Sequence, residues 1–276
     1  MSASVEAPSG KHRNDENFPV GSILIRAALR PHVHAFYAFA RNGDDIADDP
    51  TLDPADKVAR LDRMEAVLLG DASSGSASAS ALRVSLAQTG VTPRHATDLL
   101  KAFRQDATKR RYATWEELLD YCRYSAMPVG RHVLDLHNED PGAYAPSDPL
   151  CAALQVLNHL QDGSKDLAAL DRCYLPDDML AQHGATVGDL TRSAATPGLR
   201  RVFDGLLDRV DALKEQAAAL PPATRDRRLR IEVAVIVGLS RRLATRLRQN
   251  DPVATRVRLR KTDAVGAVLS ALRFAR

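Results

Sequence analysis

The chain has 276 residues, of which 45% are hydrophobic and 5% aromatic, and its formal net charge is +3. These values exclude a chain too polar to form a folded core, and no apolar run approaches the roughly 18 residues of a membrane span. Alanine, leucine and arginine dominate and runs of β-branched residues are few, which favours an all-α fold.

The N-terminal segment 1–17 is small and polar, and we expect it to be mobile. The first helix is predicted to begin at Pro31, because Val33, Phe36 and Tyr37 follow it at helical spacing.

Further helices are predicted over 56–69, 93–111, 114–137, 148–170, 198–219, 222–249 and 252–272. The stretch ASSGSASASA at 72–81 predicts a flexible loop inserted within one domain. Thr114 is a candidate N-cap, and Asp148 with Pro149 indicates a helix start. Since nothing alternates strand with helix and no glycine-rich phosphate loop occurs, we expect residues 18–276 to form a single all-α domain.

The three cysteines, Cys122, Cys151 and Cys173, show no paired spacing. This pattern argues against a disulfide framework and indicates a reducing compartment. No basic-then-apolar signal begins the chain, so we expect a cytoplasmic protein.

An acidic cluster follows an apolar helical stretch in FARNGDDIADD, residues 39–49. Asp44 and Asp48 are four residues apart, so they project from one helix face, with Asp45 beside them. Their carboxylates repel unless a cation lies between them, and Mg²⁺ prefers such oxygen ligands and bridges to phosphates. A solvated acidic helix end is the alternative explanation.

A second pair, Asp162 and Asp166, repeats this spacing after the apolar stretch AALQVL. Two such helices facing each other would line a cavity with carboxylates on opposite walls. That arrangement suits the departure of diphosphate, with Mg²⁺ neutralising the leaving group. Two unrelated exposed acidic ends are the alternative.

Three motifs, in this order, resemble the squalene and phytoene synthases: FYAFARNGDDIADD (36–49), YCRYSAMPVG (121–130), and NHLQDGSKD with the following DRCYLP (158–176). The resemblance extends from about residue 15 to about residue 250. It implies an isoprenoid-synthase helical bundle with a central apolar cavity and a mouth that binds Mg²⁺ and diphosphate.

One branch of that family resembles the chain in DENFPVGS (15–22), ARNGDDIADDP (40–50) and the proline of SAMPVG (125–130). This branch of the bacterial hopanoid pathway converts presqualene diphosphate to hydroxysqualene. The implied reaction is ionisation, rearrangement of a cyclopropylcarbinyl cation and capture by water. Squalene, presqualene diphosphate and phytoene synthases, which start from other diphosphates such as farnesyl diphosphate, are the alternatives within the family.

The resemblance assigns the metal ligands to Asp44, Asp45 and Asp48 in the first cluster and to Asp162 and Asp166 in the second. Asp44, Asp48, Asp162 and Asp166 are also the implied catalytic residues. The cofactor that this set implies is Mg²⁺.

Substrate-binding candidates also follow from the resemblance: Arg41, Asn158, Gln161, Tyr37, Tyr121, Tyr124 and Phe18. The guanidinium of Arg41 would donate to phosphate oxygens. The tyrosines would line the cavity, with packed core positions as their alternative. Phe36 and Phe39 would join Phe18 in a wall around the hydrocarbon.

Two positions depart from the family pattern. Gln161 stands where arginine is usual, and Lys165 where an acidic residue is common. Because fewer cationic contacts suit a substrate with one diphosphate, we expect that the chain does not join farnesyl units.

The C-terminal third is basic, with 19 Lys and Arg against 8 Asp and Glu from Arg192 onward. This region contains three arginine-rich stretches: RDRRLR (225–230), RRLATRLR (241–248) and RVRLRK (256–261). Such stretches are typical of solvated helix faces or of docking on anionic lipid at the inner membrane face. A non-catalytic adaptor that binds nucleic acid is the third alternative. No aromatic residues are interleaved with these arginines, so nucleic acid is not expected. The sequence does not indicate an oligomeric state.

Overall fold

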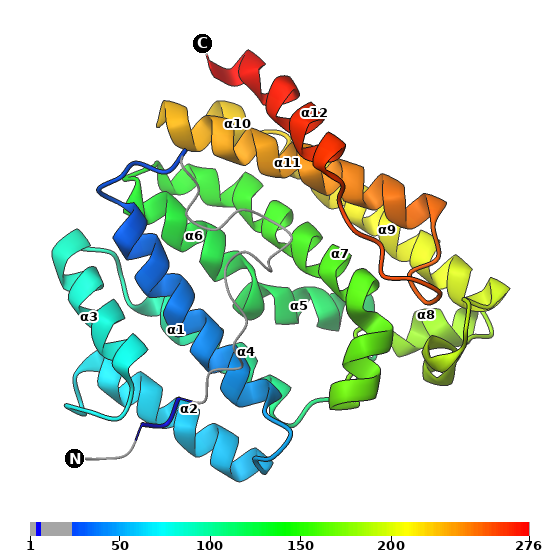
Figure 1. Cartoon of the computed structure of the whole chain (residues 1–276), viewed down its shortest axis with the longest axis horizontal. Helices are drawn as coiled ribbons and strands as arrows, with labels where there is room; N and C mark the ends of the chain where they lie inside the picture. The colour runs from blue at the N-terminus through cyan, green and yellow to red at the C-terminus, as the bar shows by residue number, and fades with distance from the viewer. Residues whose placement is uncertain (1–3, 7–23, 276) are drawn as a thin grey trace.

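The computed structural model describes residues 4–6 and 24–275, and every regular element in these ranges is helical (Figure 1). The all-α prediction is therefore confirmed. The helices are α1 (Arg30–Asp48), α2 (Pro54–Leu69), α3 (Ala77–Thr89), α4 (Arg94–Asp106), α5 (Trp115–Ser125), α6 (Met127–Leu136), α7 (Tyr144–Leu170), α8 (Asp177–Gln182), α9 (Pro197–Ala217), α10 (Leu220–Ala223), α11 (Arg227–Gln249) and α12 (Lys261–Ala271).

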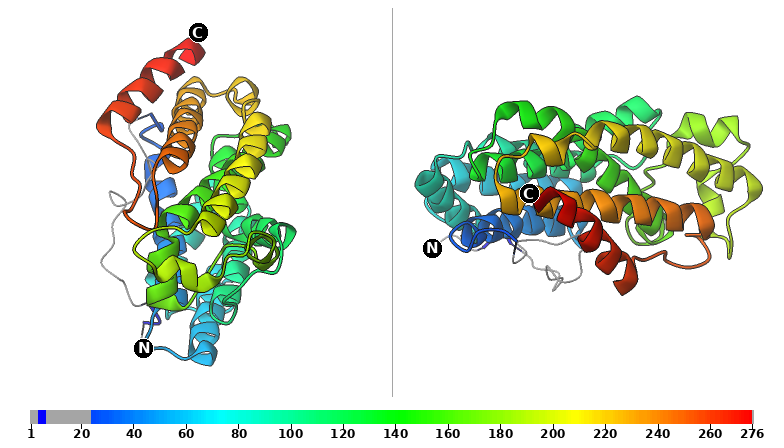
Figure 2. Two further views of the ribbon diagram at one scale, coloured as in Figure 1. Left: turned by 90° about the vertical axis from the view of Figure 1, so that its right-hand side faces the viewer. Right: turned by 90° about the horizontal axis from the view of Figure 1, so that it is seen from above.

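The long helix α7 lies at the centre and contacts α5, α6, α9 and α11 (Figure 1). Helices α1 to α4 pack together on one side of it, and α12 lies on the outside of the bundle against α11 (Figure 2). None of the helices that the structure describes is long and apolar enough to cross a bilayer.

Helix ends follow the capping residues of the sequence. The Thr114 side chain accepts a hydrogen bond from the Glu117 N–H at 3.3 Å, which confirms the predicted N-cap of α5. Asp226 caps α11 by accepting from the N–H groups of Arg228 and Leu229, both at 2.9 Å. This cap separates α11 from the short helix α10, so α11 begins at Arg227 and not at the predicted residue 222.

The predicted helix over 114–137 is two helices, interrupted at Ala126. Pro128 has no N–H to donate to the preceding turn, and Ala126 leaves the helical conformation at φ −127° and ψ −47°. The chain therefore turns between α5 and α6 within the SAMPVG motif.

Other boundaries differ from the predictions because of capping and local contacts. Helix α7 begins at Tyr144 and includes Pro149, since a 3₁₀ turn over Pro141–Ala143 leads into it. Helix α12 begins only at Lys261, nine residues later than expected.

Helix α3 begins inside the stretch that we expected to be a loop. Ser76 caps it by accepting from the Ala79 N–H at 3.1 Å, and the Glu6 carboxylate accepts from both the N–H and the hydroxyl of Ser78, at 2.8 and 2.6 Å. Residues 4–6 of the segment expected to be mobile are thus held against the start of α3.

Two glycines allow helices to approach closely. A Cβ atom at Gly43 would lie 2.7 Å from the Phe103 ring, and one at Gly130 would lie 2.5 Å from Ser147 Oγ and 2.6 Å from Cys151 Sγ. Gly43 therefore sets the distance between α1 and α4, directly before Asp44. Gly130, in SAMPVG, does the same for α6 and α7.

The variant Gly43→Ala is expected to lose roughly 1–3 kcal/mol of unfolding free energy. Alanine is the better helix former by about 1 kcal/mol, but its methyl group overlaps the buried Phe103 ring. Urea unfolding measures the loss, and the double variant Gly43→Ala/Phe103→Leu should regain part of it. A Gly43→Ala protein as stable as wild type would contradict the close packing.

Candidate active site

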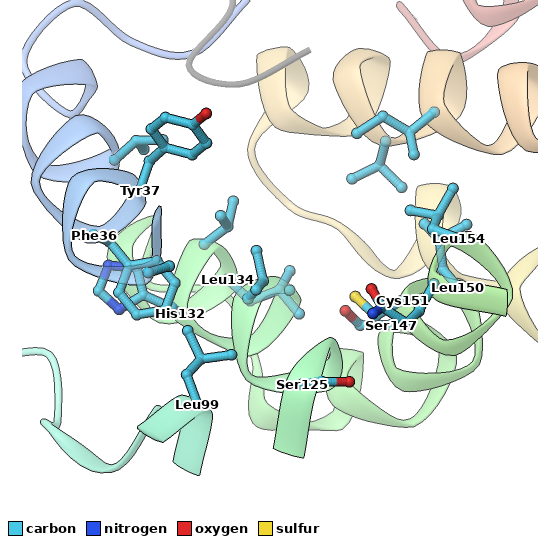
Figure 3. A pocket seen from close by; sticks show the side chains of 18 of the residues that line it. Phe36, Tyr37, Leu99, Ser125, His132, Leu134, Ser147, Leu150, Cys151 and Leu154 are labelled. Atoms are coloured by element: carbon cyan, nitrogen blue, oxygen red, sulfur yellow. The ribbon is translucent and has the colours of Figure 1, made fainter. Parts of the chain in front are cut away.

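An apolar cavity of about 420 Å³ lies between α1, α4, α6, α7 and α11. Figure 3 shows side chains from the facing helices converging on it. Most of its wall is hydrocarbon, from Val33, Phe36, Leu99, Phe103, Leu134, Leu150, Leu154, Val233 and Ile236. Arg41 and Asp44 also line it, so the cavity extends to the first acidic cluster.

Three aromatic residues that we predicted to surround the substrate line this cavity. Tyr37 and Phe36 project from α1 (Figure 3), and Tyr121 from α5. The Phe36 ring stacks on the buried His132 ring, with centroids 3.8 Å apart. This part of the wall is therefore a flat aromatic surface.

Three other aromatic candidates lie elsewhere. Tyr124 is not among the cavity-lining residues of the described chain, because its ring packs against the core with the Lys101 ammonium group 5.4 Å from its centroid. Phe39 is fully buried in the packing around α1. Phe18 lies outside the described residues.

A guanidinium group pairs with the first acidic cluster on its own helix. Arg41 Nε donates to Asp45 Oδ1 at 2.9 Å, and Arg41 Nη1 lies 3.1 Å from Asp44 Oδ2. Asp45 is buried, whereas Asp44 is partly exposed at the cavity mouth. Of these two carboxylates, Asp44 is therefore the one that a ligand in the cavity can reach.

A buried arginine connects the end of this cluster to the cavity wall. Arg172 Nη1 donates to Asp48 Oδ1 at 3.0 Å and to the Tyr174 hydroxyl at 3.2 Å, and Nη2 donates to the Asp106 carbonyl at 2.9 Å. The Tyr121 hydroxyl donates to Asp106 Oδ2 at 2.7 Å. Burial raises the pKa of Asp106 to about 6, although the positive charge of Arg172 opposes the rise.

Sequence reasoning missed Arg172 and Asp106 as site residues. Arg172 stands in the DRCYLP motif, whose resemblance was the available signal, but no role was assigned to it. Asp106 ends α4 with no motif around it, and it joins the site only because α4 packs beside α1. His159, whose ring stacks 3.5 Å from that of Tyr174, extends the same network.

The second cluster lies on α7 and is covered by the segment between α11 and α12. Arg256 Nη2 donates to Asp162 Oδ2 at 2.8 Å, and Gln161 Nε2 donates to the Val257 carbonyl at 2.6 Å. Gln161 therefore helps to hold the segment that carries Arg256. The sequence analysis noted that Gln161 replaces the usual arginine and so removes a positive charge. It missed the positive charge that Arg256 supplies nearby.

The two acidic clusters influence each other. Burial, together with the negative charges of Asp162 and Asp48, raises the pKa of Asp166 to about 7. Asp48 belongs to α1, so the carboxylates of α1 and α7 lie close enough to repel one another. Asn158 is half-buried on α7, one turn before Asp162.

The chemistry of this donor set suits a hard divalent cation. Asp162 Oδ1 is buried and has no hydrogen bond, although Arg256 lies beside it. Within residues 4–6 and 24–275, no three Asp, Glu, His or Cys side chains are already arranged to hold a metal ion. Guanidinium groups instead pair with the carboxylates of Asp44, Asp45, Asp48 and Asp162, so a metal ion at these oxygens would compete with the arginines.

Comparisons with known proteins agree on one family. The model of the squalene/phytoene synthase family matches residues 11–263. The chain is 45% identical over 272 residues to a hydroxysqualene synthase of Rhodopseudomonas palustris, covering 99% of this chain and 93% of the relative. It is 45% identical over 248 residues to a hydroxysqualene synthase of Sinorhizobium fredii, covering 90% and 84%. The crystal structure of a squalene synthase from Alicyclobacillus acidocaldarius superposes with a TM-score of 0.75 at 35% identity, covering 86% of this chain and 90% of that chain.

Removing the Asp166 carboxylate is expected to stabilise the metal-free protein at pH 8. A carboxyl group whose folded-state pKa is about 7 destabilises the fold above that pH, and this effect vanishes as the pH falls below the unfolded value of 3.8. We expect Asp166→Asn to gain roughly 1–3 kcal/mol at pH 8 and to approach wild type towards pH 4.

Urea unfolding at both pH values without Mg²⁺ measures this difference. Asp171→Asn is the control of opposite sign, because a hydrogen bond from Arg111 lowers the pKa of the exposed Asp171. A gain for Asp166→Asn that is independent of pH would contradict the electrostatic explanation.

Proposed function

Because the chain belongs to the squalene/phytoene synthase family of isoprenoid-forming enzymes, we propose that it is a hydroxysqualene synthase of hopanoid biosynthesis. Its substrate would be presqualene diphosphate. The ester C–O bond breaks and its electron pair leaves with diphosphate. The resulting cyclopropylcarbinyl cation rearranges, a water oxygen adds to it, and the added water loses a proton.

The observation that carries this proposal is the continuity between the apolar cavity and the acidic mouth. Asp44 and Arg41 line the same cavity as Phe36 and Leu150. A substrate with a long hydrocarbon and one diphosphate needs both surfaces side by side. The hydrocarbon wall also limits the access of bulk water to a cation, so that capture by water occurs at a restricted position.

Asp44, Asp48, Asp162 and Asp166 are the residues that would hold Mg²⁺, whereas Asp45, which the sequence also suggested, is buried and paired with Arg41. When bound, Mg²⁺ neutralises negative charge on the diphosphate and makes it a better leaving group.

The chain's own groups act around that centre. The guanidiniums of Arg41 and Arg256 are placed to donate to phosphate oxygens once they leave their carboxylates. The Phe36 and Tyr121 rings line the cavity, and aromatic rings there would stabilise a passing carbocation.

The product branch rests on the names of the relatives and on the glutamine at position 161. Both relatives described above carry the name hydroxysqualene synthase. Squalene, presqualene diphosphate and phytoene synthases are the alternatives within the family. We further propose that farnesyl units are not joined here. Gln161 supports this, although Arg256 compensates part of the charge that position 161 lacks.

Purified protein with presqualene diphosphate and Mg²⁺, and without NADPH, is expected to form hydroxysqualene. Asp44→Asn should lower the rate by about 100-fold or more, because it removes a cavity-facing ligand for the cation that stabilises the leaving diphosphate. Chromatography with mass detection identifies the product. Squalene or a phytoene-type hydrocarbon would move the assignment to another branch. The absence of turnover by folded protein would contradict the proposal.

The variant Arg256→Gln is expected to raise KM for presqualene diphosphate about tenfold, because a charge-assisted hydrogen bond to phosphate contributes roughly 1.5–3 kcal/mol. Arg258→Gln is the matched control. It lies two residues away, is exposed, and pairs with no acidic residue in the described ranges. Steady-state kinetics in detergent should leave the control at the wild-type KM. An equal effect of both substitutions would contradict a specific role for Arg256.

A further inference from the structure

Helix α12 packs against the protein with its small residues and exposes its large ones. Ala267 and Ala271 are buried against Ala234, Val235 and Leu239 of α11. The large aliphatic residues of α12 and of the 3₁₀ turn Leu272–Ala275 that follows it face outward, with exposed fractions of 59% for Val265, 45% for Val268, 63% for Leu269 and 53% for Leu272. A helix that only stabilised the fold would bury these side chains instead.

The four outward residues form one continuous stripe, which we call the α12 stripe: Val265, Val268, Leu269 and Leu272. Their spacing of three, four and seven residues from the first places them on the same helix face. Only three other large hydrophobic residues of the described chain are exposed, namely Leu69, Val84 and Val129. Exposed apolar surface is therefore concentrated on α12.

Cations lie at both ends of the α12 stripe. Arg258, Arg260 and Lys261 precede it, Arg273 follows it, and all four are exposed. In the ranges that the structure describes, these side chains form no ion pair with an acidic residue. Cations at the beginning of a helix also oppose its macrodipole, so an external anion would stabilise them.

Neighbouring arginines of α11 differ in this respect. Arg246 pairs with Asp263 at 2.6 Å, and Arg248 pairs with Asp208 and Asp211 at 2.7 and 2.6 Å. Arg242 Nη1 donates to the Gly238 carbonyl at 3.0 Å. Several cations of the basic C-terminal third are thus already paired within the protein, whereas those beside the α12 stripe form no ion pair among the described residues.

We propose that α12 binds in the plane of an anionic bilayer, with the α12 stripe among the acyl chains and the flanking cations at lipid phosphates. A helix with aliphatic residues on one face and cations at its margins is suited to this interfacial position. Eleven residues are too few for it to span the bilayer. A second copy of the chain fits less well, because a symmetric contact would bring the same cations together.

This docking would place the cavity mouth near the membrane. The segment that covers Asp162 through Arg256, and that is held by the hydrogen bond from Gln161 to Val257, leads directly into α12. An apolar polyprenyl substrate and its product both partition into lipid. Membrane binding itself does not rest on the proposed reaction.

Vesicle co-sedimentation tests the proposal with the full chain. Wild type is expected to pellet with vesicles of phosphatidylcholine and phosphatidylglycerol, and less with phosphatidylcholine alone. Leu269→Ser/Leu272→Ser should weaken binding about tenfold or more. Lys261→Gln/Arg273→Gln should remove the preference for anionic lipid. Val84→Ser, at a position that is 54% exposed on the distant helix α3, is the matched control and should bind as wild type does.

Circular dichroism and turnover in detergent should be the same for all these variants, which shows that they fold. Equal binding of wild type and the stripe variant, or no binding by wild type, would overturn the proposal. So would a wild-type dimer in light scattering that the stripe variant converts to a monomer, or salt-sensitive DNA binding in place of vesicle binding. Vesicle binding by a protein that does not turn over presqualene diphosphate would contradict the proposed function but would still support membrane binding by α12.

Discussion

The site depends on how carboxylates of different helices are kept together in a partly buried place. Like charges at short range repel, and burial strengthens that repulsion. Arg172 resolves much of it, because one guanidinium donates to Asp48 at the end of α1 and to the backbone of Asp106 at the end of α4. A buried charge without partners would cost several kcal/mol, so the two helix ends and the arginine hold one another in place.

The cavity owes its form to the same close packing. Gly43 brings α1 against Phe103 of α4, and Gly130 brings α6 against α7. Between these contacts lies a space that hydrocarbon side chains line but do not fill. Tyr121 joins the two parts of the site, since its ring faces the cavity while its hydroxyl binds Asp106. The polar mouth and the apolar cavity are therefore linked through this one side chain.

Local sequence was enough to predict the helical fold and to select the acidic clusters, because both leave a periodic pattern within a few residues. Contacts between distant parts of the chain leave no such pattern. Arg172 lies 124 residues from Asp48, and Arg256 lies 94 residues from Asp162. The start of α3 was missed for the same reason, since the Glu6 carboxylate that binds Ser78 is 72 residues away.

In the proposed site, the pairing of arginines with carboxylates would make ligand binding cooperative. A cation bound by Asp44 or Asp162 would release Arg41 or Arg256, and a diphosphate would offer those guanidiniums new acceptors. Each ligand would thus remove part of the free energy that the other must spend to separate an arginine from its carboxylate. By linkage, the cation strengthens diphosphate binding by the same factor as diphosphate strengthens cation binding. Departure of the cation and of diphosphate would be coupled in the same way, because the loss of either ligand favours the return of the arginines to their carboxylates and so weakens the binding of the other.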